Sequence, residues 1–81
     1  MQFSYDPRYN IAYIRFQKQP AEVESIRVSD EIIVDMTPDG TVYGIELLNA
    51  NQQLTREDGG VLEVLNEATG QRMQLPLTLG P

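Results

Sequence analysis

A β-hairpin is the clearest feature of the sequence, in residues 32–48, IIVDMTPDGTVYGIELL. The first run, Ile32–Met36, is rich in the β-branched residues that suit the pleated surface of a strand. Residues 37–40, TPDG, place proline where a type I turn fixes φ and glycine where the chain needs a positive φ. We therefore expect the second run, Val42–Leu48, to pair antiparallel with the first.

The side chains of this hairpin are predicted to form two apolar faces. Because side chains alternate along a strand, pairing Thr37 with Thr41 fixes which residues share a face. One face then holds Ile33, Tyr43, Ile45 and Leu47, and the other holds Ile32, Val34, Met36, Val42 and Leu48. A small antiparallel sheet usually leaves one face to water, so we expect both faces to be covered. We expect the C-terminal residues to cover one face and another subunit or a different protein to cover the other. The face with Ile33, Tyr43, Ile45 and Leu47 is the predicted interface. The alternative is that this chain covers both faces itself.

Three further strands are predicted before the hairpin. Phe3–Tyr5 alternates apolar with polar residues, residues 6–10 supply turn chemistry, and Ile11–Phe16 form a longer strand. In the longer strand, the side chains predicted to face the core are those of Ala12, Ile14 and Phe16. The third strand lies within Val23–Val28, where the alternation slips, and the slip indicates a bulge or a late strand start.

The segment after the central hairpin is predicted to hold at most one helical turn, near residues 50–58. Residues 49–54 lose the strand alternation, and Thr55 and Asp58 have the spacing of a helix capping box. Two consecutive glycines at 59 and 60 argue against a longer helix.

The C-terminal segment allows two predictions. The apolar residues between Val61 and Ala68 fit either a helical stripe or the first strand of a second hairpin. We choose the hairpin, because residues 67–70, EATG, suit a turn and residues 73–79 alternate strictly. Pro76 then marks the last strand as a sheet edge.

These elements predict a single mainly β domain, 1–81, with a small antiparallel meander sheet of about six or seven strands. A chain of 81 residues buries only about 60–65% of its unfolded surface. Since the sequence has no cysteine, disulfides cannot supplement this small core. A partner subunit would stabilise such a chain.

The composition excludes several classes of function. With no histidine and no cysteine, the chain cannot build a Ser-His-Asp or Cys-His pair or a typical zinc site. The one lysine, Lys18, is predicted to be solvated, which disfavours a Schiff base. A formal net charge of −6 opposes binding to nucleic acid. The sequence shows no signal peptide and no membrane span, so we expect a cytoplasmic protein with no membrane partner.

Carboxylates are the remaining candidates for chemistry, namely Asp30, Glu31, Asp35 and Glu46. In the register assumed above, Asp35 and Glu46 fall on opposite faces and form no cluster. We therefore expect no catalytic residue, no metal and no cofactor. Gly44, isolated within a strand, indicates close packing or a bulge rather than a ligand contact.

The sequence resembles a family of small, mostly bacterial proteins catalogued as domain of unknown function 2283. The residues that carry the resemblance are Tyr5-Asp6-Pro7, the strand 12–16, AYIRF, and the block from Ile32 through Asp39-Gly40 to Ala50, together about residues 2–52. The resemblance implies a compact β-rich fold and no established activity or ligand. Genes of this family are thought to accompany small toxin-like proteins, so it also suggests an antitoxin or partner-binding role.

We expect a non-enzymatic protein-interaction module that self-associates, because catalytic residue types are missing and the central hairpin has apolar side chains on both faces. The alternative is an antitoxin-like inhibitor whose acidic surface covers a small basic toxin. A metal-dependent hydrolase built on the four carboxylates is a third hypothesis.

Overall fold

The computed structural model describes residues 1–77 as seven strands and one short helix. Along the chain these are β1 (Gln2–Asp6), β2 (Ile11–Arg15), β3 (Glu24–Arg27), β4 (Ile32–Met36), β5 (Val42–Leu48), α1 (Ala50–Thr55), β6 (Val61–Leu65) and β7 (Arg72–Pro76). The predicted mainly β fold is confirmed.

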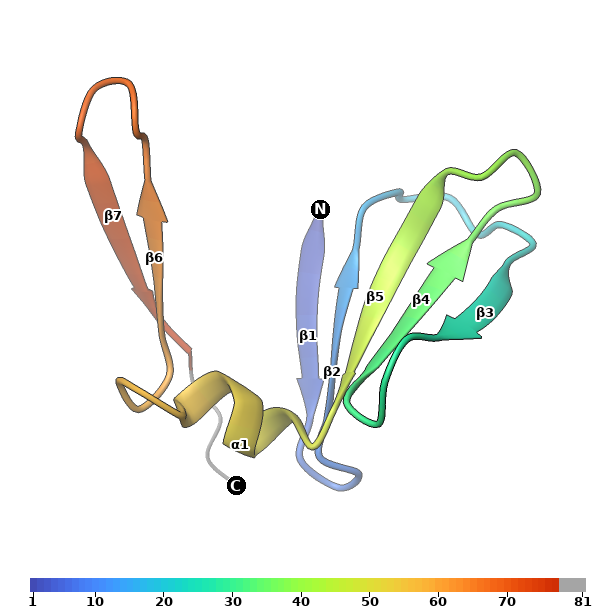
Figure 1. Ribbon diagram of the computed structural model, residues 1–81, viewed down its shortest axis with the longest axis horizontal. Coiled ribbons are helices and arrows are strands. Elements are labelled where there is room, and N and C mark those ends of the chain that lie inside the picture. Colours follow the sequence, from blue (N-terminus) through green and yellow to red (C-terminus); the bar gives the residue numbers. More distant parts are fainter. Residues whose placement is uncertain (78–81) are drawn as a thin grey trace.

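The strands divide into two antiparallel sheets (Figure 1). The larger sheet has five strands in the order β1-β2-β5-β4-β3, so the N-terminal hairpin β1–β2 joins the meander β3–β4–β5 through β2 and β5. The smaller sheet is the hairpin β6–β7, which stands apart from the larger sheet beyond α1 (Figure 1). The third strand begins at Glu24, after Val23. A late strand start was one of the two explanations predicted for the slip in its alternation.

A β-bulge interrupts the central hairpin. Asp35 lies opposite Gly44, whereas the next residue, Met36, lies opposite Val42. Tyr43 is therefore an extra residue on β5, with no partner in β4. The predicted regular register is correct next to the turn, where Thr37 pairs with Thr41, and is wrong beyond the bulge.

The bulge reverses the predicted sharing of faces. Ile32 lies opposite Leu47, and Val34 lies opposite Ile45. Ile45 and Leu47 therefore share a face with Ile32 and Val34, and Ile33 points to the other side. The prediction that Ile33 shares a face with Ile45 and Leu47 is wrong, and so is the prediction of two apolar faces.

The helix is attached to the β1–β2 turn through Asn10. The Asn10 carbonyl accepts a hydrogen bond from the Ala50 amide at 2.9 Å, and Asn10 Oδ1 accepts one from the Asn51 amide at 2.7 Å. Asn10 Nδ2 donates to Asn49 Oδ1 at 3.3 Å and to Gln52 Oε1 at 3.1 Å. These contacts fix the direction in which the chain leaves the sheet after β5.

The predicted capping box is wrong, because the helix ends where the box was expected to start one. Its first residue is Ala50 and its last is Thr55, whose hydroxyl donates to the Asn51 carbonyl. Asp58 instead accepts hydrogen bonds from the amides of Gly60 and Val61, at the start of β6.

The second hairpin is confirmed, with β6 and β7 paired from Val61–Pro76 to Leu65–Arg72. The helical alternative for residues 61–68 is thereby excluded. The predicted last strand ran to Leu79, and its residues from 78 onward lie outside the described part of the chain.

The described residues enclose almost no core. Of their apolar side chains, only Ala12 and Ala50 are buried, and none of the large ones is fully buried. Phe16, predicted to face the core, lies beyond the end of β2 and is 45% exposed. The radius of gyration is 14.2 Å, whereas about 12 Å is expected for a compact chain of this length. The expectation of a compact fold is not met by this arrangement.

Candidate interaction surface

One face of the five-stranded sheet is apolar. Two rows of cross-strand pairs run across it, and adjacent residues in a row share a face because they are directly opposite each other. The first row is Phe3, Ile14, Ile45, Val34 and Ile26, and the second is Tyr5, Ala12, Leu47 and Ile32. We call these nine residues the apolar face.

The apolar face is open at both of its edges. Phe3 on β1 is 40% exposed and Ile26 on β3 is 42% exposed. Between them, Ile14, Ile45 and Val34 are only half-buried, although they occupy the centre of the sheet. A sheet centre covered by its own chain would be buried, so this face has room for a further layer.

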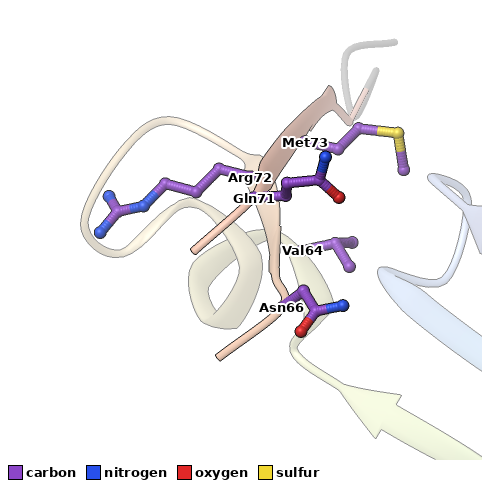
Figure 2. A pocket seen from close by; sticks show the side chains of 5 residues that line it. All are labelled: Val64, Asn66, Gln71, Arg72 and Met73. Carbon is purple, nitrogen blue, oxygen red and sulfur yellow. The ribbon is translucent and has the colours of Figure 1, made fainter. Parts of the chain in front are cut away.

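The hairpin β6–β7 carries a second apolar surface. Leu62 pairs with Leu75 and Val64 with Met73, which places all four on one face. We call these four residues the hairpin quartet, and each of them is between 44% and 55% exposed. In Figure 2, Val64 and Met73 project to one side of the hairpin and Arg72 extends to the other.

The opposite face of this hairpin carries its charged side chains, beside the apolar residues Val61, Leu65 and Pro76. Glu63 Oε1 forms an ion pair with Arg72 Nη1 at 3.6 Å, and its other oxygen accepts a hydrogen bond from Gln74 Nε2 at 3.3 Å. The hairpin is therefore amphipathic, with its charges directed away from the quartet.

The chain exposes more surface than a compact protein of its mass. Its accessible surface is 6149 Å² for 9.2 kDa, and a compact monomer of this mass exposes about 4,900 Å². The excess of about 1,200 Å² is close to what each subunit of a dimer with a large interface buries.

The other face of the five-stranded sheet carries a polar cluster centred on Asp35. The Tyr13 hydroxyl donates to Asp35 Oδ2 at 2.7 Å, and the Ser25 hydroxyl donates to Asp35 Oδ1 at 2.6 Å. Gly44 lies beneath the Tyr13 ring, where a Cβ would collide with it. The prediction that Gly44 marks close packing or a bulge is confirmed on both counts, since the bulge is at the adjacent residue.

Tyr13 is held in its neutral form. Burial raises the pKa of its hydroxyl well above the usual range, and the hydrogen bond and negative charge of Asp35 raise this pKa further. The Tyr13 hydroxyl stays protonated and donates a hydrogen bond to the Asp35 carboxylate. Such a hydroxyl has a structural role and does not act as a nucleophile.

The candidate carboxylates do not assemble into a site. Asp30 is exposed in the β3–β4 turn, and Glu31 Oε2 pairs with Arg56 Nη2 at 3.5 Å. Asp35 and Glu46 share the polar face, which corrects the predicted opposite placement and follows from the bulge. Within residues 1–77, no three acidic side chains come together as metal ligands.

The predicted interface residues are only partly brought together. Ile45 and Leu47 belong to the apolar face, Ile33 lies on the polar face, and Tyr43 is the bulge residue. Their role in an interface stays a prediction. The hairpin quartet was not among the predicted interface residues, although the alternation at 62 and 64 and at 73 and 75 was visible in the sequence.

The one helix of residues 1–77 has six residues, too few to cross a membrane. No curated protein and no solved structure gives a significant match to the chain. A family model, described as a protein of unknown function (DUF2283), matches residues 2–51. This match spans β1 to β5, the strands that build the whole apolar face. Since it covers more than half of the chain, the protein belongs to the DUF2283 family.

Proposed function

We propose that this protein is a non-enzymatic interaction module that self-associates through the apolar face. The observation that carries the proposal is the open centre of the sheet, where Ile14, Val34 and Ile45 are only half-buried. Removing apolar surface from water is worth about 25 cal/mol per Å², so an uncovered face of this extent favours association.

The chemistry of the chain supports a non-enzymatic role. It contains neither histidine nor cysteine, and its tyrosine with a shifted pKa, Tyr13, is held neutral. The exposed charge is mainly acidic, which disfavours nucleic acid as a partner. The apolar face is therefore the surface with the clearest capacity to bind another protein.

The oligomeric state tests this proposal. We expect light scattering on a sizing column to give twice the chain mass of 9.2 kDa, with the dimer dissociating on dilution. Ile26→Asp should shift the mass toward the monomer, because it places a charge on the apolar face of β3 in both subunits. Arg27→Asp is the matched control on the same strand, since its side chain points to the polar face. A folded wild-type monomer at every concentration would contradict the proposal.

A second candidate is an antitoxin-like inhibitor of a small basic toxin, favoured by the formal net charge of −6. Binding to a neighbouring gene product that weakens steeply with added salt would support it. Absence of binding at low salt would remove it.

A further inference from the structure

The hairpin β6–β7 needs a surface to pack on. Its two strands form hydrogen bonds with each other and belong to no larger sheet. An isolated two-stranded hairpin is only marginally stable in water, and this one leaves its quartet about half exposed. Its apolar side is therefore left in contact with water.

The apolar face and the hairpin quartet match each other chemically. Neither set contains a charged side chain, and the ion pair of Glu63 with Arg72 lies on the far side of the hairpin. Packing the quartet on the sheet would remove two apolar surfaces from water without burying a charge.

The attachment of α1 holds the hairpin away from the apolar face of its own chain. The hydrogen bonds of Asn10 to the start of α1 set the path of the chain after β5. Gly59 and Gly60, with φ of 73° and 101°, then turn the chain into β6. The hairpin consequently projects as an arm beside the sheet (Figure 1).

We infer that the arm of one subunit packs its quartet on the apolar face of a second copy of this chain, and that the exchange is reciprocal. This inference rests on the proposed self-association and specifies its geometry. A two-fold symmetric pair satisfies both arms and both faces at once and leaves neither surface for a third copy.

The amount of exposed surface agrees with this pairing. An excess of about 1,200 Å² per chain gives an interface of about 2,400 Å² in total, and obligate homodimers bury 2,000–5,000 Å². The hairpin residues follow the part of the chain that the family model matches.

Nuclear Overhauser effects between subunits test the exchange directly. Uniformly ¹³C-labelled and unlabelled wild-type chains are mixed, so that an isotope-filtered spectrum reports contacts between different copies only. We expect cross-peaks from the Met73 methyl group to methyl groups of the apolar face, such as those of Ile14 and Ile45. Cross-peaks from sheet to sheet without the hairpin would overturn the exchange and leave self-association standing. If the filtered spectrum lacks the hairpin cross-peaks and an unfiltered spectrum of the same protein shows them, the arm folds onto its own sheet and the exchange is overturned.

A pair of variants gives an independent measurement. Met73→Asp should weaken the dimer at least a hundredfold, because the charge enters the interface twice. Gln74→Asp, on the polar face of the same strand, should change the dissociation constant less than threefold. Equal dissociation constants for the two variants would overturn the exchange. A monomeric wild-type protein would instead contradict the proposed function itself.

Discussion

Asn10 and Asn49, 39 residues apart, both adopt a left-handed backbone, with φ of 56° and 53°, and are joined by a side-chain hydrogen bond of 3.3 Å. One ends the turn between β1 and β2, and the other precedes α1. Asparagine is among the few residues that tolerate this conformation, since its amide can bond locally. The pair thereby joins the β1–β2 turn to the start of α1, the helix that leads to the arm.

Asn10→Ala should lower the free energy of unfolding by about 2–3 kcal/mol, measured by urea denaturation. The substitution removes side-chain hydrogen bonds worth about 1 kcal/mol each and forces alanine into a left-handed backbone. Asn10→Gly is the matched control, because glycine accepts this φ and loses only the hydrogen bonds. Equal losses for the two variants would show that backbone strain is not part of the effect.

Gly44→Ala should destabilise the protein by about 1–3 kcal/mol, because the new Cβ collides with the Tyr13 ring. The displaced ring would also lose its hydrogen bond to Asp35. In a Tyr13→Ala background the same glycine substitution should have little effect, so a double-mutant cycle gives a large coupling. Additive losses would show that Gly44 is required for another reason.

Tyr13 should make the protein sensitive to alkali. Because its pKa is raised in the folded state, the folded protein keeps a proton that the unfolded chain releases near pH 10. The stability contributed by Tyr13 is therefore complete below about pH 10 and is lost as the pH rises beyond it. Urea denaturation of the wild-type protein and Tyr13→Phe should show a stability difference that is constant up to about pH 10 and shrinks as the pH rises further. A difference independent of pH would contradict the raised pKa.

Asp39 should contribute to stability in the opposite pH range. Hydrogen bonds from the Thr37 hydroxyl and from the Thr41 amide lower the pKa of Asp39. A lowered pKa contributes stability that is present above about pH 4 and is lost as the pH falls through the folded-state value. Wild-type protein and Asp39→Asn should therefore converge in thermal stability under acid conditions. Parallel curves down to pH 2 would show that the charge of Asp39 does not matter.

Local patterns were sufficient to predict most strands and turns. The segment TPDG at residues 37–40 forms the expected hairpin turn, with a φ of 86° at Gly40. The strict alternation at 73 and 75 identified β7, and the hairpin that it implied favoured a strand over a helix for residues 61–68. These features depend on neighbouring residues, whose conformational preferences act within a few positions.

The isolated Gly44 indicated close packing or a bulge, but the change of register at Tyr43 could not be predicted from local patterns. It places Gly44 opposite Asp35, where the Tyr13 side chain from β2 covers the glycine and bonds the carboxylate. Tyr13 lies 22 residues from Asp35, so this preference is invisible in the hairpin sequence. A one-residue shift moves every following side chain to the other face, which is why the predicted interface contained Ile33.

The sequence by itself determined the element types, the turns and the lack of histidine and cysteine chemistry, because these follow from residue identity and local spacing. Only the tertiary structure decided the register of β4 on β5, the single apolar face and the separation of the arm β6–β7 from the sheet. Each of these depends on contacts between distant residues, namely Tyr13 with Asp35 and Asn10 with Asn49. These contacts between distant residues stabilise the protein only once the chain has folded, so local sequence patterns do not reveal them.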